Sequence, residues 1–556
     1  MTLIASDDYA YQAAFVADNA WRLLSMQDAD ALSPSHGCFH YAYWRDKTSE
    51  FADARFQEAG ATLGLLTHPH FDPARAVGRL APVERLYDGF AAALGALARQ
   101  QYPEGCYDEW YKGERGFAAT EFTTIAYGLA ARFMGERLRP AERAVLAEVM
   151  TKAGGWLARR HDRVKANHEA SAAAALALAW EVTGNAGFKA AARAAVDDTL
   201  ARQQSEGWFP EIGGMDLGYC SVLLDYLMIH ATVTGDGEAI PAMRRLFAFM
   251  RPHIHPDGTI GPESGLCLNP YVSRLGLGLL ATWDEDAAAL LTRLRTASPG
   301  PKGLTPYLAD DLRLCRWSHL AATAVLMTAR PDRVPALSFE QRYPQGWTIR
   351  RDSLVAAFHR DDLHVYFAPA GGGAVRVYRG ATLVAEDIGV SLRDASGHWG
   401  SVGYDTDRPL EEQDGGLEMR SALRPAAFFY PSFLARLILR LGSSFAWSSY
   451  LMRALIDAYR LRARTAINQS AAPVTKGRET YGFSRRVEII DNAVIVRDRL
   501  HSRGSAIAPA GLVLTPPPSG PMDTTLVMPA KAVEIRKIFN ADGTSAVTIG
   551  PMIVEE

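Results

Sequence analysis

Apolar positions recur at helical spacing through the first part of the chain, from about residue 8 to residue 330. The pattern is broken at intervals by Gly, Pro and Asp, as expected of helices joined by loops. It predicts helices at 8–27, 53–67, 84–100, 118–134, 141–159, 167–183, 186–204, 219–234, 238–252, 273–296 and 316–328. Segment 171–180 is apolar on nearly every side, which is typical of an inner helix covered by an outer layer. Helical hairpins arranged in a ring or an arc would provide that layer.

After residue 337 the apolar period changes toward two, with β-branched and aromatic runs at 354–358, 363–368, 375–378, 486–490 and 493–497. Turn-forming residues at 371–373, 394–397 and 491–492 separate such runs. This pattern predicts a β-sandwich or a layered antiparallel sheet. A chain of 556 residues exceeds the usual size of a single core. We therefore expect a helical domain over 1–335 and a β domain over 336–556.

One segment of the β half, 427–466, is helical in character, apolar and basic. It carries six arginines against one aspartate, a net charge of +5. The arginines interrupt it too often for it to cross a bilayer. It is either a helical insertion packed on the sheet or a basic amphipathic helix pair in contact with an anionic membrane surface.

Charge and composition exclude several classes of function. A formal net charge of −3 argues against a nucleic-acid partner. The five cysteines are far apart and form no CxxC pair, and the histidines lack zincin spacing, so we expect no disulfide framework, metal or cofactor. No GxSxG, P-loop or GxGxxG motif is present. The N-terminus lacks the pattern of a secretory signal, which predicts a cytoplasmic location, with the inner-membrane surface as a peripheral contact.

Asn167 and His168 stand directly before the apolar run that begins at residue 170. They should open an inner helix, where the positive end of the helix dipole helps to bind an anion. Side by side, an amide and an imidazole can hydrogen-bond a substrate carboxylate. The alternative is that Asn167 only caps the helix and His168 lies on the surface.

A glycine-rich loop over 207–218 leads into a predicted helix at Tyr219. Its glycines allow close approach of the backbone, and Trp208 offers a stacking face for a sugar ring. Tyr219 could act as a general base if its surroundings lowered its pKa. The alternative is that these aromatic residues fill the core between helices.

Loop 107–115 is dense in charged and aromatic residues, including Asp108 and Glu109. Paired carboxylates suit a glycosidase, and they equally suit hydrogen bonding to a sugar. Two weaker groups, Asp257 with Glu263 and Arg274, and an early loop with Tyr43, also lie between predicted helices. Since functional residues gather on loops, one shared face is plausible.

The order of these loop sequences resembles the heparinase II/III-like proteins. The residues that carry the resemblance are Gly37-Cys38-Phe39 with Tyr43-Trp44, Asp108-Glu109-Trp110-Tyr111, Asn167-His168, Gly207-Trp208-Phe209-Pro210-Glu211 leading to Tyr219, and Asp257-Gly258 with Glu263. The resemblance covers most of the chain and implies an (α/α) toroid followed by an antiparallel β-sandwich. Residues 264–269 depart from it, because a polar stretch is expected there and the sequence reads SGLCLN.

The resemblance implies a polysaccharide lyase that cleaves a uronic-acid-containing glycan by β-elimination, in capsule or exopolysaccharide metabolism. Tyr219 would abstract the C5 proton, and Asn167 and His168 would neutralise the uronate carboxylate. The residues expected to bind the acidic polysaccharide are Tyr43, Trp44, Glu109, Trp110, Tyr111, Glu114, Arg115, Trp208, Glu211, Asp216, Glu263 and Arg274. Two alternatives stay open: a glycoside hydrolase on the same scaffold, and a non-catalytic glycan-binding or assembly protein of polysaccharide biosynthesis.

Overall fold

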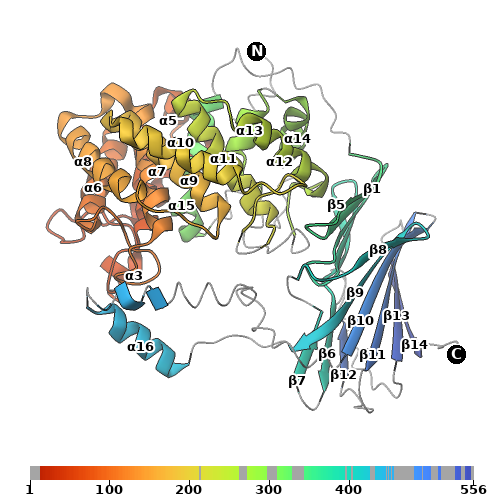
Figure 1. The fold of residues 1–556 in the computed structure, drawn as a ribbon. Helices are drawn as coiled ribbons and strands as arrows, with labels where there is room; N and C mark the ends of the chain where they lie inside the picture. Colours follow the sequence, from red (N-terminus) through yellow and green to blue (C-terminus); the bar gives the residue numbers. More distant parts are fainter. Residues whose placement is uncertain are drawn as a thin grey trace.

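A computed structural model places a helical region before two antiparallel β-sheets (Figure 1). The structure describes residues 13–211, 214–261, 272–282, 284–296, 310–328, 343–394, 397–401, 405–425, 432–445, 448, 450–452, 454–455, 481–490, 492–502, 511–514, 532–539 and 545–551. The predicted boundary at residue 335 lies outside these residues. The α+β architecture predicted from the change of period is confirmed.

Eleven helices in the described part of the chain form an inner and an outer set. The inner helices are α4 (Glu58–Leu65), α7 (Phe117–Met134), α9 (Ala166–Thr183), α11 (Leu217–Thr234), α13 (Leu275–Leu280) and α15 (Asp311–Thr328). The outer helices are α6 (Val83–Gln100), α8 (Pro140–Leu157), α10 (Ala186–Leu200), α12 (Ile240–Met250) and α14 (Glu285–Thr296). Shorter elements are α2 (Ala20–Met26), α3 (Tyr41–Trp44), α5 (Asp72–Ala76), η1 (Ala54–Gln57), η2 (Pro69–Phe71), η3 (Gly135–Arg137) and η4 (Arg251–His253).

The inner helices close into a ring. Each packs against the next in the order α4, α7, α9, α11, α13, α15, and α15 packs back against α4. Every outer helix contacts an inner helix that is its neighbour along the chain. Because an outer helix returns the chain between successive inner helices, the inner helices run in the same direction and begin at the same end of the ring.

Inner helices are buried on nearly all sides, as the apolar run in α9 predicts. Every residue of α9 from Ala166 to Ala179 is buried. Gly128 of α7 allows close packing, since a Cβ there would lie 2.7 Å from the Cβ of Leu178 in α9. Helix α11 is long and apolar enough to cross a membrane, but most of it is buried, as expected of a core helix.

One predicted helix, 273–296, is wrong as a single element. The structure divides it into α13 and α14. Asp284 supplies the reason, because its side-chain Oδ1 accepts a hydrogen bond of 3.0 Å from the Ala287 amide and thereby caps the start of α14.

The β region contains two antiparallel sheets within the described residues. One sheet has the order β1-β2-β3-β4-β5, and the other has the order β12-β6-β7-β9-β10-β11-β13-β14 with β8 paired to β9. The strands are β1 (Gly346–Arg350), β2 (Val355–Arg360), β3 (Leu363–Ala368), β4 (Ala374–Arg379), β5 (Thr382–Asp387), β6 (Val390–Asp394), β7 (Gly397–Gly400), β8 (Leu410–Gln413), β9 (Gly416–Pro425), β10 (Tyr481–Ile490), β11 (Ala493–Ser502), β12 (Gly511–Leu514), β13 (Ala532–Phe539) and β14 (Ser545–Pro551).

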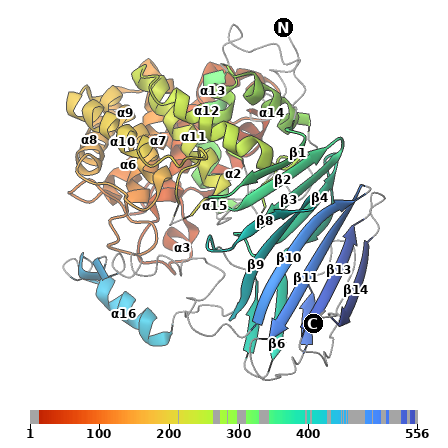
Figure 2. The same cartoon turned by 45° about the vertical axis from the view of Figure 1, so that its right-hand side comes forward.

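The two sheets share one hydrophobic core, to which Phe367 of the first sheet and Met419 of the second both belong. The first sheet lies toward the helices and the second faces away from them (Figure 2). Between the helical region and the first sheet, Tyr366 Oη donates to the Ile254 carbonyl at 3.1 Å, and His359 Nε2 lies 2.9 Å from the Pro252 carbonyl. These contacts place the first sheet against the loop that follows α12.

The basic segment 427–466 lies between β9 and β10, which pair with each other. Its described part includes the helix α16 (Phe433–Ser443). Helix α16 lies beneath the helical region, beside α3 (Figure 1). Residues 456–466 are outside the described part of the chain.

Candidate active site

The candidate site lies at the end of the ring where the inner helices begin. Two contacts tie the start of α9 to the glycine-rich loop before α11. The Ala166 amide donates to the Pro210 carbonyl at 3.1 Å, and the Asn167 amide donates to Glu211 Oε1 at 2.8 Å. The two loop motifs of the sequence therefore meet, although about 40 residues separate them along the chain.

Asn167 is completely buried in the first turn of α9. Among the described residues, neither Nδ2 nor Oδ1 of its side chain makes a hydrogen bond of normal geometry. The amide nevertheless lies close enough to Glu211 to oppose the rise in that carboxyl's pKa. A buried amide without a full set of partners has donor and acceptor capacity left for another group.

His168 lies beside Asn167 and is also buried. Its Nδ1 atom is 3.2 Å from Glu121 Oε1 and 3.4 Å from Asp162 Oδ2. Its Nε2 atom is 3.5 Å from Lys165 Nζ. Burial raises the pKa of Glu121 well above its ordinary value, which favours a neutral carboxyl beside the imidazole. His168 is thus held by polar groups and does not lie free on the surface.

Tyr219 is half-buried in the first turn of α11. Asp216 caps this helix by accepting a hydrogen bond of 2.9 Å from the Tyr219 amide. Burial, together with the charges of Asp216 and Glu211, raises the pKa of the Tyr219 phenol to about 12, and Arg55 opposes that rise. The phenol is therefore protonated at neutral pH, whereas a general base needs a lowered pKa.

Glu211 and Asp216 stabilise the loop itself. Glu211 is buried, and its pKa is raised to about 8 by burial, against the opposing hydrogen bond from the Asn167 backbone amide and the nearby Asn167 side chain. Its backbone exchanges two hydrogen bonds with Gly214, which joins these two residues shortly before α11. Trp208 is buried rather than open to stack on a sugar, which corresponds to the core-filling alternative.

Arg274 stands directly before α13 and is half-buried. Its neighbours attach to α11: the Ser273 amide donates to Ser221 Oγ at 2.8 Å, and the Gly276 amide donates to Asp225 Oδ1 at 2.6 Å. The structure thereby fixes Arg274 against the first half of the Tyr219 helix. Glu263, predicted for the same loop, lies outside the described residues.

Loop 102–117 is folded by its own carboxylates. Asp108 accepts hydrogen bonds from the Gly113 and Arg115 amides at 2.7 and 2.8 Å. Glu114 accepts from the Glu109 and Trp110 amides, both at 2.8 Å. Of the predicted sugar-binding residues here, Trp110 is 66% exposed and Tyr111 is half-buried, so their rings are the accessible ones. Arg115 is buried against the ring of Tyr102.

The structure shows Tyr43 and Trp44 in their own small cluster. Both belong to the short helix α3 and pack against a small cluster that includes Cys38 and Ala96. The structure thus brings Asn167, His168, Glu211, Asp216 and Tyr219 to one place, whereas α3 belongs to the neighbouring loops of the N-terminal part.

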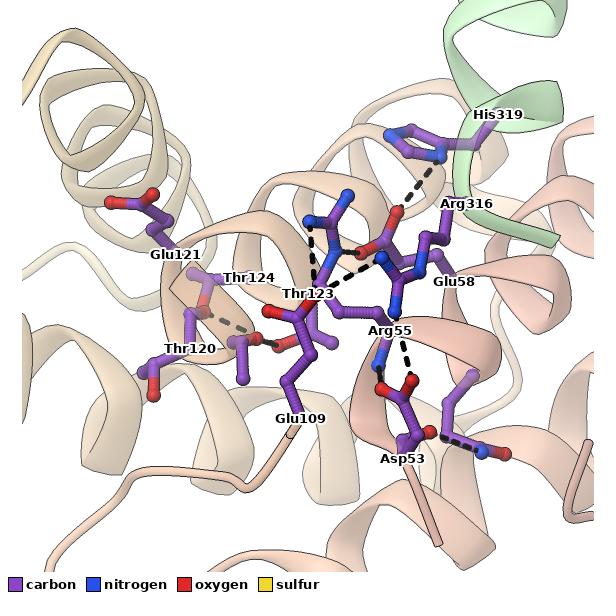
Figure 3. Close-up of polar contacts among 12 residues, drawn as sticks. Asp53, Arg55, Glu58, Glu109, Thr120, Glu121, Thr123, Thr124, Arg316 and His319 are labelled. Atoms are coloured by element: carbon purple, nitrogen blue, oxygen red, sulfur yellow. Dashed lines mark hydrogen bonds and ion pairs between the residues drawn. The ribbon is translucent and has the colours of Figure 1, made fainter. Parts of the chain in front are cut away.

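A buried cluster of charged side chains adjoins the site, and the sequence analysis missed most of it (Figure 3). Arg55 pairs with Glu58, and Arg316 pairs with Asp53 at 2.9 Å and with Glu109 at 3.0 Å. Glu109 was predicted as a substrate-binding residue, and here it is the member that loop 102–117 contributes. The cluster joins η1 and α4 to α15, where the ring closes.

Burial governs the ionisation of this cluster. It raises the pKa of Glu58 to about 7 and that of Asp53 to about 6, while the neighbouring arginines oppose both shifts. It lowers the pKa of His319 to about 3, and the charge of Arg55 adds to that shift. His319 Nδ1 lies 3.7 Å from Glu58 Oε2, so a neutral imidazole faces a carboxyl that titrates near neutrality.

Phe122 connects this cluster to the candidate site. Its ring lies 4.0 Å from the Arg55 guanidinium, and 5.6 Å from the rings of both His168 and Tyr226. Arg55 is also the cation that opposes the rise in the pKa of Tyr219. No sequence signal could have indicated Arg55, because its partners become neighbours only when the ring forms.

Among the described residues, no group of three His, Cys, Asp or Glu side chains is arranged to hold a metal ion. The histidines at the base of the first sheet have structural contacts. His359 Nδ1 lies 2.9 Å from His364 Nδ1, and the His359 ring stacks on Tyr343 at 4.1 Å.

No protein-family model matches this sequence, and no curated protein matches it. Solved structures do resemble it. The chondroitin AC lyase of Streptomyces coelicolor A3, solved as a point mutant, has a TM-score of 0.54 at 12% identity, and the match covers 95% of this chain and 68% of that one. A Paenibacillus xanthan lyase has a TM-score of 0.50 at 11% identity, over 98% of this chain and 49% of that one. Heparinase III has a TM-score of 0.45 at 9% identity, over 87% and 73%.

This chain spans about half the length of the xanthan lyase and about two thirds of the chondroitin AC lyase. At such low identity the likeness concerns the fold alone. That fold, a helical toroid followed by antiparallel sheets, is the polysaccharide lyase-like fold that the resemblance to heparinase II/III-like proteins predicts.

Proposed function

We propose that this protein is a polysaccharide lyase that cleaves a uronic-acid-containing glycan by β-elimination. The observation that carries the proposal is the buried Asn167 amide, whose side-chain atoms lack full hydrogen-bond partners beside the start of the Tyr219 helix. It supplies a neutral donor at the positive end of α9, and Glu211, which binds the Asn167 backbone amide, lies within electrostatic reach of the Tyr219 phenol.

β-Elimination requires both a donor that binds the uronate carboxylate and a group that exchanges the proton. A proton α to a carboxylate is only weakly acidic, because removing it adds negative charge beside an anion. Donors that bind the carboxylate stabilise this charge as it develops. We assign that role to Asn167 and His168, which are adjacent on the first turn of α9.

Tyr219 is the proposed base, and it would also return the proton to the departing 4-oxygen. The elevated pKa of the phenol suits the second role, because a protonated phenol can donate to the departing oxygen. The first role needs the cation Arg55, whose charge favours the phenolate. Substrate binding would have to add to this stabilisation before the base could act near neutral pH.

The carboxylates favour a lyase over a glycoside hydrolase. Asp108, Glu114, Glu211 and Asp216 each accept hydrogen bonds from backbone amides. Glu109 is paired with Arg316. A hydrolase needs one carboxyl free to protonate the leaving oxygen and a second free to activate water or attack the sugar. These five help to fold the loops and close the ring, while Glu263, also considered for hydrolysis, lies outside the described residues.

The test is an absorbance assay for the unsaturated uronate product on a panel of acidic polysaccharides that includes chondroitin and xanthan. We expect the double-bond absorbance to rise with wild-type protein and to be lost in Tyr219→Phe. New reducing ends without that absorbance would favour hydrolysis. Glycan retention on an affinity gel with neither product would favour a binding or assembly protein. Full activity in Tyr219→Phe would remove Tyr219 from the mechanism.

The proposed setting is the handling of capsule or exopolysaccharide inside the cell. Fractionation of the native host cells would check it. Recovery of the protein in the culture medium would contradict this setting while leaving the proposed chemistry intact.

A further inference from the structure

Large apolar side chains are exposed along one stretch of the chain, 433–455. This stretch contains most of the exposed large apolar residues in the described part of the protein. Five of them are on α16, with exposures of 76% for Phe433, 62% for Leu434, 40% for Leu437, 51% for Ile438 and 59% for Leu441. Soluble proteins rarely leave such a contiguous patch open to water.

The five residues lie on one side of α16. At about 100° per residue they span an arc of about 140°. Leu439 is half-buried and lies outside this arc, so the side of the helix that carries it is the one turned toward the protein. The apolar side of α16 therefore faces solvent rather than a sheet.

The charge of this segment is of one sign. Residues 427–455 contain Arg436, Arg440 and Arg453 and no aspartate or glutamate. Arg436 and Arg440 fall next to one edge of the apolar arc. A helix with an apolar side, arginines along its edge and no acid matches an anionic lipid surface, where the apolar side enters the interface and the arginines meet the headgroups.

The segment is fixed to the helical region by its other contacts. Arg440 Nη2 pairs with Glu50 Oε1 at 2.5 Å. Tyr450 Oη donates to Glu104 Oε1 at 2.7 Å, and the Arg115 guanidinium lies 4.2 Å from the Tyr450 ring. These contacts hold α16 at the side of loop 102–117 and leave its apolar side outward.

We propose that α16 docks this protein on an anionic membrane surface. The apolar side of the helix enters the lipid interface, and Arg436, which is exposed beside that side, contacts the acidic headgroups. Loop 102–117, with the exposed Trp110, is thereby held near the membrane. The inference does not depend on the proposed lyase activity.

The experiment is flotation of the full-length protein with phosphatidylcholine vesicles containing about 30% phosphatidylglycerol, beside vesicles of phosphatidylcholine alone. We expect the protein to float with the anionic vesicles and to be released by high salt. The double variant Leu437→Asp, Ile438→Asp should bind at least about tenfold more weakly, because it places charge on the apolar side. Arg436→Gln should bind more weakly to the anionic vesicles.

The matched control is Leu32→Asp with Val77→Asp, two residues that are 95% and 67% exposed outside the α16 segment. It should float as the wild type does, and circular dichroism should show that both double variants are folded. Equal flotation of the two double variants would overturn the proposal. Absence of flotation with anionic vesicles would also overturn it. Light scattering would then show whether the protein is a monomer or a dimer that the α16 variant dissociates. A dimer of that kind would assign the apolar side to a second copy of the chain.

Discussion

The pKa of Tyr219 gives a quantitative test of its proposed role. A phenol with a pKa of about 12 is ionised in about one molecule in 10⁴ at pH 8, against about one in 10² for an ordinary tyrosine. If the phenolate of the free enzyme abstracts the proton, kcat/KM is proportional to that fraction. We therefore expect kcat/KM to increase about tenfold per pH unit from about pH 7 to about pH 10 without levelling off.

The assay measures initial rates of double-bond absorbance across this pH range, on the acidic polysaccharide that the panel identifies. Tyr219→Phe should lower kcat/KM by about 10²-fold to 10⁴-fold and remove the alkaline slope. Arg55→Gln should raise the pKa of Tyr219 further, because it removes the charge that favours the phenolate. At a fixed pH its kcat/KM should therefore fall.

Tyr87→Phe is the matched control. Tyr87 is on the outer helix α6, with its hydroxyl 3.1 Å from Glu142 of α8. This variant should keep both the rate and the pH slope. A plateau below about pH 9 in the wild type, or an alkaline slope that survives in Tyr219→Phe, would refute the assignment of the base.

Three further predictions concern binding and stability. Asn167→Ala should lower kcat/KM by about 10²-fold to 10³-fold with little change in the urea midpoint, and a fall below about threefold would exclude it as the carboxylate donor. The pKa of Glu58, about 7, is raised above its unfolded value, so its contribution to stability is present below about pH 4.5 and is lost as pH rises through about 7. The variant Glu58→Gln cannot ionise at this position. Its free energy of unfolding, relative to wild type, should therefore rise by about 2 kcal/mol between about pH 5.5 and pH 8 in urea titrations. A fall over this range would mean that the ion pair between Arg55 and Glu58 dominates. Gly276→Ala should cost about 1–3 kcal/mol, since a Cβ there would lie 2.6 Å from the Asp225 amide nitrogen in α11, whereas Gly95→Ala meets only the end of the Arg99 side chain and should be neutral or stabilising.

Much of the fold could be predicted from local patterns. The apolar periods located most of the helices of the helical region and the strands β2, β3, β4, β10 and β11. The all-round apolar run before Trp180 identified α9 as an inner helix. The break between α13 and α14 was missed, because it depends on a single capping carboxylate within an otherwise helical pattern. The exposure of the apolar side of α16 could not be predicted from the sequence either, because a packed and an exposed amphipathic helix have the same sequence pattern.

The candidate site was predicted only where a motif stood next to a helix start. Asn167, His168 and Tyr219 were found in this way, and their roles stay predictions. The sequence did not indicate that Glu114 and Asp216 bind backbone amides, because a carboxylate on a loop looks the same whether it binds substrate or its own chain.

The sequence by itself determined the element types, their order and the loops that could carry chemistry, because periodicity and turn residues act over a few positions. Only the tertiary structure decided which loops meet. Closure of the ring brings Arg316 to Asp53 and Glu109 across more than 200 residues, and it places Arg55 where its charge reaches Tyr219. Electrostatic effects of that kind depend on distance and burial, which exist only after the inner helices have packed.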